Sequence, residues 1–323
     1  MTLANDIPLG PDGRPDAASC ARIAGALGPI IDAHHHLWDL ETNCYPWLQD
    51  QPVTAHFGDY SAIRRSYLVA DLRDDLGPAR LAGSVHVEAH WRGGTAPDGE
   101  TAWLAGQARD HGLPSVMMGA ADLRAPDLDQ VLAAHQAHSG FRGIRVMAMG
   151  RGDPEGAALY RDPAFLRGME MLAARDLCVD LQAPAITQGA VAELAARFPE
   201  TRIAIIHCGL PLDRSDAGLR LWRDGMSRLA DAPNVVVKLS GLPMTDRHWT
   251  CDNLAPLVQH LLAAYGAKRL MFGSNFPVDG LFSDYPTLLT AYVAALGATE
   301  AGLRAIFHDT AQEFYRIEDT SKT

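Results

Sequence analysis

The chain has 323 residues, of which 47% are hydrophobic and 21% are charged, so it can bury a large core. Its formal net charge is −11, from 28 basic and 39 acidic residues, and no lysine–arginine cluster is present. This balance argues against a nucleic-acid or anionic-membrane surface. No apolar run approaches the roughly 18 residues that span a bilayer. The five cysteines include no CxxC pair, which predicts reduced thiols and no thiolate zinc site.

In chain order, residues 1 to 27 are rich in Pro, Gly, Asp and Ala, which predicts an extended N-terminal arm. Short apolar runs then alternate with longer amphipathic ones. We expect strands at 30–33, 82–88, 115–120, 143–147, 178–182, 203–207, 235–239 and 270–272. We expect helices between them, at 101–111, 128–138, 163–175, 187–197, 218–229 and 252–264.

Eight strand–helix units in succession indicate an α/β fold of the (β/α)8 TIM-barrel type. An open doubly wound sheet would carry a glycine-rich phosphate turn after its first strand, and here that place holds histidines. The sequence therefore predicts an N-terminal arm (1–28), one barrel domain (29–316) and a short tail (317–323).

Three consecutive histidines follow the first predicted strand. Side chains alternate along an extended strand, so His34 and His36 should share a face and His35 should point away. Two imidazoles at one strand end can bind a divalent ion or bracket a polar substrate group. The alternative is a histidine-rich surface turn, which the preceding apolar strand and the following Trp38 disfavour.

The segment between the first two strands, residues 39–79, is long and aromatic. It contains Tyr45, Trp47, Phe57 and Tyr60. Loops at the carboxyl ends of barrel strands build active sites, so these rings could form a pocket wall. They could equally pack the loop onto the barrel rim, and the sequence leaves both open.

Polar side chains also stand at the ends of the other predicted strands. They are Glu88, Arg145, Gln182, His207, Lys238, Asn275 and Asp279. Each alone has a structural explanation, such as a solvated charge or a core imidazole. Together they place polar groups at the end of the barrel where a site is expected.

These elements resemble the amidohydrolase superfamily. The similar features are His34-x-His36 after the first strand, His207-Cys208-Gly209 after the sixth and residues 273–277, GSNFP, after the eighth. Residues 32–39 and 237–241 resemble the branch of sugar-lactone and pyrone-dicarboxylate lactonases in particular. The resemblance covers about residues 29–316 and implies a barrel that hydrolyses carbonyl centres, with decarboxylases in a neighbouring branch.

Two departures from the family pattern concern the chemistry. The eighth strand usually supplies an Asp as the base, but this chain has Asn275, and an amide cannot take a proton at neutral pH. The fifth strand ends in Gln182, where multi-metal relatives have a Lys or a His. A binuclear centre is therefore not expected.

From the residues and the resemblance together we expect a hydrolase that opens a small lactone, either of a sugar acid or carrying a carboxylate. His34, His36 and His207 would polarise the carbonyl, directly or through one divalent ion, with zinc favoured; catalysis without metal stays open. Asp279 or His207 would replace the missing base, and Asn275 would face the same cavity. The expected substrate contacts are Glu88, Arg145, Gln182, Lys238, Tyr45 and Trp47.

Two other functions stay open at this point: a metal-dependent decarboxylase and a barrel that binds an acid or lactone without turnover. The expected partner is a small molecule, with no nucleic acid and no membrane, and a homo-oligomer is compatible with the sequence. The N-terminus lacks a charged-then-apolar signal pattern, so we expect a cytoplasmic protein.

Overall fold

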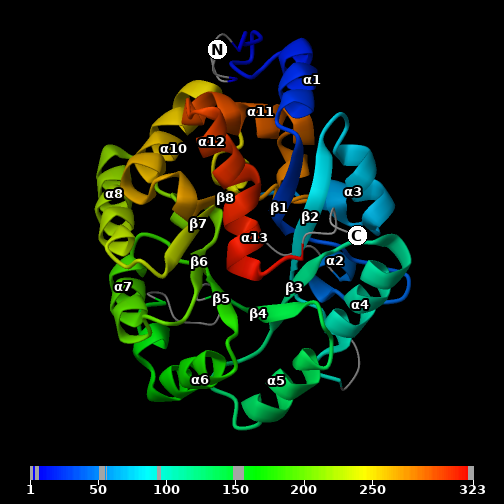
Figure 1. The fold of residues 1–323 in the computed structure, drawn as a ribbon, viewed down its shortest axis with the longest axis vertical. Coiled ribbons are helices and arrows are strands. Elements are labelled where there is room, and N and C mark those ends of the chain that lie inside the picture. The colour runs from blue at the N-terminus through cyan, green and yellow to red at the C-terminus, as the bar shows by residue number, and fades with distance from the viewer. Residues whose placement is uncertain are drawn as a thin grey trace.

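The fold is an eight-stranded parallel barrel surrounded by helices, as seen in a computed structural model that describes residues 3, 7–50, 55, 57–92, 96–147 and 156–318 (Figure 1). The strands pair in chain order: β1 (Pro29–His35), β2 (Arg80–Val87), β3 (Val116–Ala120), β4 (Phe141–Val146), β5 (Cys178–Leu181), β6 (Ile203–Ile205), β7 (Val235–Leu239) and β8 (Leu270–Phe272). Parallel bonds from the segment after β8 to β1 close the ring, with Asn275 N donating to His34 O at 2.7 Å and His36 N to Phe276 O at 2.8 Å. The predicted fold class is confirmed.

The helices surround the barrel (Figure 1). They are α1 (Ala17–Ala26), α2 (Pro46–Gln49), α3 (Val69–Asp75), α4 (Gly99–His111), α5 (Leu128–Gln136), α6 (Pro163–Ala174), α7 (Gln188–Arg197), α8 (Asp216–Ala230), α9 (Leu242–Thr245), α10 (Cys251–Tyr265), α11 (Tyr285–Leu296), α12 (Glu300–Arg304) and α13 (Thr310–Tyr315). In the described part of the chain, no helix combines the length and the apolar character needed to cross a membrane.

The expectation of an extended N-terminal arm is wrong for residues 17–26, which form α1. Asp16 caps this helix by accepting the Ser19 N–H at 2.7 Å. Ile23 and Ala24 are buried, and α1 packs against α11. The Pro- and Gly-rich composition of residues 1–27 does not indicate this helix, because α1 is stabilised mainly by its packing against the rest of the protein.

The C-terminal helix α13 closes one end of the barrel. Phe314 and Tyr315 pack in one apolar cluster with Ile31, Val85 and Met118 of the strands. Arg142, at the start of β4, donates to the Tyr315 carbonyl at 2.8 Å, so α13 covers the amino ends of the strands. The carboxyl ends are left for a site.

Candidate active site

A cavity of about 240 Å³ opens beyond the carboxyl ends of the strands. The residues that line it are His36, Trp47, Ala55, Phe57, Tyr60, Ala89, His90, Arg145, Met147, Gln182, His207, Met244, Asn275 and Val278. Five of the predicted site residues outside the loop are in this set: His36, Arg145, Gln182, His207 and Asn275. This is the end of a (β/α)8 barrel at which active sites are built.

The first-strand histidines are buried and divide between two faces as predicted. His34 and His36 have ring centroids 5.2 Å apart, and His34 lies 4.5 Å from His207. His35 instead faces His86 at 5.9 Å. The surface-turn alternative is wrong, since none of the three is more than 5% exposed.

An irregularity in β1 re-aims these side chains. Asp32 pairs with Ser84 and His35 pairs with His86, so β1 contains one extra residue over this interval. The Asp32 carboxylate turns to Tyr285 of α11, whereas His34 reaches Lys238. Simple alternation would have put Asp32 and His34 on one face, and the bulge separates them.

The ring of His36 is held in a defined tautomer. Its Nδ1 lies 2.7 Å from the Val87 carbonyl, which can only accept, so Nδ1 carries the proton. Burial, followed by the charge of Arg145, lowers the pKa of His36 to about 3. His36 is therefore neutral at physiological pH, with a lone pair on Nε2.

Three lining residues have left-handed backbone conformations that side chains rarely adopt. The φ angles are 61° at His90, 54° at His207 and 57° at Asn275. Gly241 makes the position of His207 feasible, because a Cβ on Gly241 would lie 2.6 Å from His207 Nδ1. The same Nδ1 lies 3.0 Å from the Ser240 hydroxyl. Such conformations concentrate at functional sites.

Arg145 is paired with Glu88. Its guanidinium lies 2.6 Å and 2.7 Å from Glu88 Oε1, and both side chains are almost fully buried. Although burial opposes it, the charge of Arg145, followed by that of His90, lowers the pKa of Glu88 to about 2. Arg145 also lies 3.1 Å from His90 Nε2. The expected substrate residue Glu88 is thus beneath the cavity wall and holds Arg145.

Asp279 lies behind Asn275 and not on the cavity surface. Asn275 Nδ2 donates to Asp279 Oδ1 at 3.0 Å, and the Gly241 N–H donates to Asp279 Oδ2 at 3.0 Å. Burial raises the pKa of Asp279 to about 8, so this carboxyl is largely protonated at pH 7. Direct water activation by Asp279, an alternative from the sequence, does not agree with this placement.

Lys238 is also not a direct substrate contact. It has no exposed surface, and its ammonium lies 2.6 Å from Asp180 Oδ2 and 2.7 Å from the Ala33 carbonyl. Burial lowers the pKa of Lys238 while the Asp180 carboxylate opposes the shift. The sequence correctly put Lys238 near the histidines, but it could not identify Asp180 as its partner.

The aromatic loop forms one wall of the cavity. Trp47, Phe57 and Tyr60 line it, and the Trp47 indole packs against Trp38 and Tyr60 at 5.6 Å and 5.5 Å. Tyr45 is fully buried and does not line the cavity. The pocket-wall and packing interpretations therefore each hold for different rings of the same loop.

The sequence missed several lining residues. His90 lies two residues after Glu88 at the end of β2, and it is not among the site residues predicted from the sequence. Met147, Met244 and Val278 carry no chemical signal that distinguishes them from core residues. Their position just past β4, β7 and β8 is the one signal that could have found them.

One divalent ion bound by His34, His36 and His207 would have three imidazole nitrogens as its protein ligands. Three imidazoles are suitable zinc ligands. In the described ranges, however, no group of three His, Cys, Asp or Glu side chains is arranged to hold a metal ion. In this structure the rings of His34, His36 and His207 are therefore not arranged as a three-ligand metal site.

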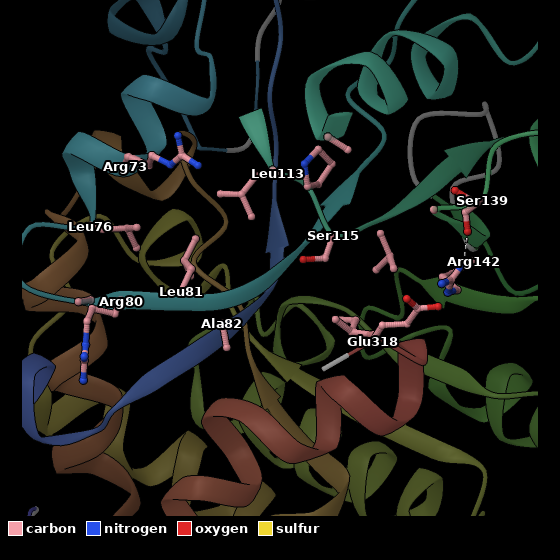
Figure 2. Close-up of a pocket in the computed structure, with 17 residues that line it drawn as sticks. Arg73, Leu76, Arg80, Leu81, Ala82, Leu113, Ser115, Ser139, Arg142 and Glu318 are labelled. Carbon is pink, nitrogen blue, oxygen red and sulfur yellow. Dashed lines mark hydrogen bonds between the residues drawn. The ribbon is translucent and has the colours of Figure 1, made fainter. Parts of the chain in front are cut away.

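A second cavity, of about 770 Å³, lies at the opposite end of the barrel (Figure 2). It is lined by the starts of β2, β3 and β4, with Arg73, Arg80, Arg142 and Glu318 around it. Active sites of (β/α)8 barrels are built at the carboxyl ends of the strands, which is the other end, so this cavity is not the candidate active site.

Comparison with known proteins identifies the family. Residues 31–317 match the family model described as amidohydrolase. The chain is 41% identical over 296 residues to the uncharacterized protein y4mH of Sinorhizobium fredii, covering 89% of this chain and 98% of that one. It is 32% identical to an L-fucono-1,5-lactonase of Burkholderia multivorans, covering 79% and 84%. A solved amidohydrolase from Burkholderia multivorans with bound zinc has 28% identity and a TM-score of 0.77, covering 90% and 100%. The chain belongs to the amidohydrolase family and is a hydrolase of that family.

Proposed function

We propose that the protein opens a small, uncharged lactone by attack of water on its carbonyl carbon. The observation that carries this proposal is the convergence of His36, His207, Arg145 and Asn275 on one small cavity. The lactonase relative supports the reaction class, since it covers most of both chains.

The proposed chemistry follows from the donors and acceptors present. Arg145 and His207 would donate hydrogen bonds to the carbonyl oxygen as it becomes an oxyanion. His36 Nε2, with its free lone pair, would orient the attacking water, although a pKa of about 3 makes it a weak base. The ring C–O bond then breaks, and the leaving oxygen takes up the proton that the water gives up. The product is a hydroxy acid.

The charge of the site favours a neutral substrate over a carboxylated one. Arg145 is the sole lysine or arginine among the described lining residues, and Glu88 already compensates its charge. His36 is neutral. A substrate carboxylate would have to compete with Glu88 for the same guanidinium. A hydroxylated lactone needs only hydrogen bonds, which Gln182, His90 and Asn275 can supply.

The apolar wall suits one face of a sugar-like ring. Besides these polar groups, the cavity lining contains the apolar side chains of Trp47, Phe57 and Met244. Aromatic faces pack well against C–H groups and exclude water from the reacting carbonyl.

The test is acid release from a panel of neutral aldonolactones by the purified protein. We expect turnover, and a loss of roughly 10²–10³-fold in His36→Gln, typical for removal of one positioned polar group. His35→Gln is the matched control, because His35 is equally buried but faces His86. Turnover equal in His36→Gln and wild type would refute the assignment. Release of carbon dioxide from an acid would instead identify a decarboxylase.

The charge argument predicts the effect of Glu88→Gln. Freeing the Arg145 guanidinium should improve kcat/KM for a carboxylated lactone relative to a neutral one by about tenfold or more, since one new charge-assisted pair becomes available. Glu100→Gln is the control. Glu100 is a neighbouring buried carboxyl that accepts the Ala89 N–H, and burial, followed by the charge of Glu88, raises its pKa. An unchanged preference in Glu88→Gln would show that Glu88 does not set the substrate charge.

A further inference from the structure

A buried series of polar contacts connects α13, the helix that closes one end of the barrel, to the first-strand histidines. The Tyr315 hydroxyl of α13 donates to Asp180 Oδ1 at 2.7 Å. Asp180 Oδ2 lies 2.6 Å from Lys238 Nζ, and Lys238 Nζ lies 3.5 Å from His34 Nδ1. All four side chains have no exposed surface.

We propose that Lys238 fixes His34 in the tautomer that carries its proton on Nε2, so that His34 acts as a hydrogen-bond donor and not as a metal ligand. Lys238 is then a positioning residue, which acts through His34 on the histidine cluster beneath the cavity.

The argument rests on what an ammonium group can do. It has three N–H donors and no acceptor. Asp180 and the Ala33 carbonyl take two donors, and His34 Nδ1 lies in reach of the third. A proton on Nδ1 would point its positive end at this cation from 3.5 Å. The lone pair of His34 therefore belongs on Nδ1, and the proton of the neutral ring on Nε2.

The neutral state of His34 follows from its surroundings. Burial, followed by the charge of Lys238, lowers the pKa of His34 well below its usual value. Its Nε2 has no hydrogen-bond partner among the described residues. A buried donor without a partner is costly, and this one lies just beneath the cavity, against the lining residues His36 and His207.

His34 thus differs from His36 in its chemistry, although both come from one strand end. His36 donates from Nδ1 to the Val87 carbonyl and keeps a lone pair on Nε2. This is the arrangement common in metal-bound histidines. His34, which lies between His36 and His207, presents a proton instead and cannot complete a three-histidine site. This assignment concerns the ring of His34 itself and does not depend on the proposed lactone hydrolysis.

The tautomer is measurable in the wild-type protein. Nitrogen-15 labelling of histidine and two-bond hydrogen–nitrogen correlation spectra distinguish protonated from unprotonated ring nitrogens, and the signals that disappear in His34→Gln identify His34 among 13 histidines. We expect Nε2 protonated and Nδ1 unprotonated. A proton on His34 Nδ1, or a mixture of both forms, overturns the proposal.

Zinc titration gives a second test. The double variant Asp180→Asn/Lys238→Met removes the buried ion pair as a unit, which avoids leaving one charge uncompensated. Without the ammonium, His34 can move its proton to Nδ1, and zinc affinity should rise by about 10–100-fold, the size of effect that groups behind a metal ligand typically have. The same double variant with His34→Gln should lose this gain.

A folded double variant that binds zinc no better than wild type overturns the exclusion of metal from His34. If the double variant does not fold, the wild-type spectrum alone decides the proposal. Neither measurement uses turnover. Inactivity toward every lactone would therefore refute the proposed function and leave the tautomer assignment standing.

Discussion

At the residue scale, the pair of Asn275 and Asp279 shows how burial decides which group can act as a base. Asn275 reaches the cavity but cannot take a proton, and Asp279 can take one but lies behind it. The two side chains are 3.0 Å apart. The carboxyl of this pair therefore lies beneath the cavity surface, and the amide lies on it.

This pairing predicts the result of Asn275→Asp. Two carboxyls at this distance cannot both ionise, and Asp279, with a pKa of about 8, can supply the shared proton. The new carboxylate would then face the cavity as a positioned base. We expect kcat for lactone hydrolysis at pH 7 to rise by at least about tenfold. The full contribution of a positioned general base, roughly 10²–10⁴-fold, sets the upper limit.

Asp279→Asn is the matched control for this experiment. It should keep wild-type kcat, because Asp279 does not line the cavity. The Asn275 side-chain amide can also rotate by 180° and so keep a hydrogen bond to the new amide. No gain in Asn275→Asp, together with inactivity of Asp279→Asn, would mean that Asp279 works through Asn275. The conclusion that Asp279 takes no part in catalysis in the wild-type protein would then be wrong.

At the scale of the element, the turn after β6 depends on a glycine in the turn after β7. His207, Cys208, Gly209 and Leu210 have φ angles of 54°, 54°, 70° and 47°, an unusual run of left-handed residues. Gly241, itself at φ 66°, leaves the space that the His207 ring occupies. The second turn therefore determines where the His207 ring of the first can lie.

Gly241→Ala should displace His207 and reduce kcat by roughly 10²-fold or more, the usual cost of misplacing a polarising group. Gly297→Ala is the control, because Gly297 at the end of α11 has φ 54° but nothing within 4 Å of an added Cβ. Both variants bear the strain of a left-handed alanine, about 1 kcal/mol. Equal activity in the two folded variants would show that the contact with His207 is unimportant.

Most of the barrel could be predicted from the sequence, because its strands are short apolar runs at regular spacing. The bounds of β7 and β8 are those expected, whereas β6 ends at Ile205 and His207 lies in the following turn. The site was predicted only as a set of strand ends. The contact that holds Lys238 away from the cavity, its ion pair with Asp180, joins residues 58 positions apart on β7 and β5. No local pattern encodes it.

At the scale of the whole molecule, the core holds many ionisable groups in their neutral forms. Burial lowers the pKa of His36 and His86 to about 3, and it lowers those of His34 and His35 well below their usual value. Burial also raises the pKa of Asp32 to about 6, that of Asp279 to about 8, and that of Glu100 above its usual value. The two sets affect stability in opposite directions as pH changes.

The signs give a stability maximum near pH 6.5. Below it, the unfolded chain binds more protons than the folded one at these histidines, so the free energy of unfolding falls as pH decreases toward 3. The raised carboxyls oppose this loss in part. Above pH 6.5 the unfolded histidines are neutral, and the carboxyls alone contribute: the folded state keeps protons that the unfolded state has released. Stability therefore falls as pH rises through the folded pKa of Asp279.

We accordingly expect the urea midpoint to be highest near pH 6.5 and lower at pH 8.5, with a loss on the order of 1–2 kcal/mol from Asp279. Asp279→Asn should remove this share of the alkaline decline and make the decline on the acid side steeper, because one raised carboxyl no longer opposes the effect of the histidines. Urea unfolding of both proteins between pH 5 and 9, followed by circular dichroism, measures the two slopes. An alkaline slope identical in wild type and Asp279→Asn would mean that Asp279 is already ionised in the folded protein, and its proton could then not be shared with a carboxylate at position 275.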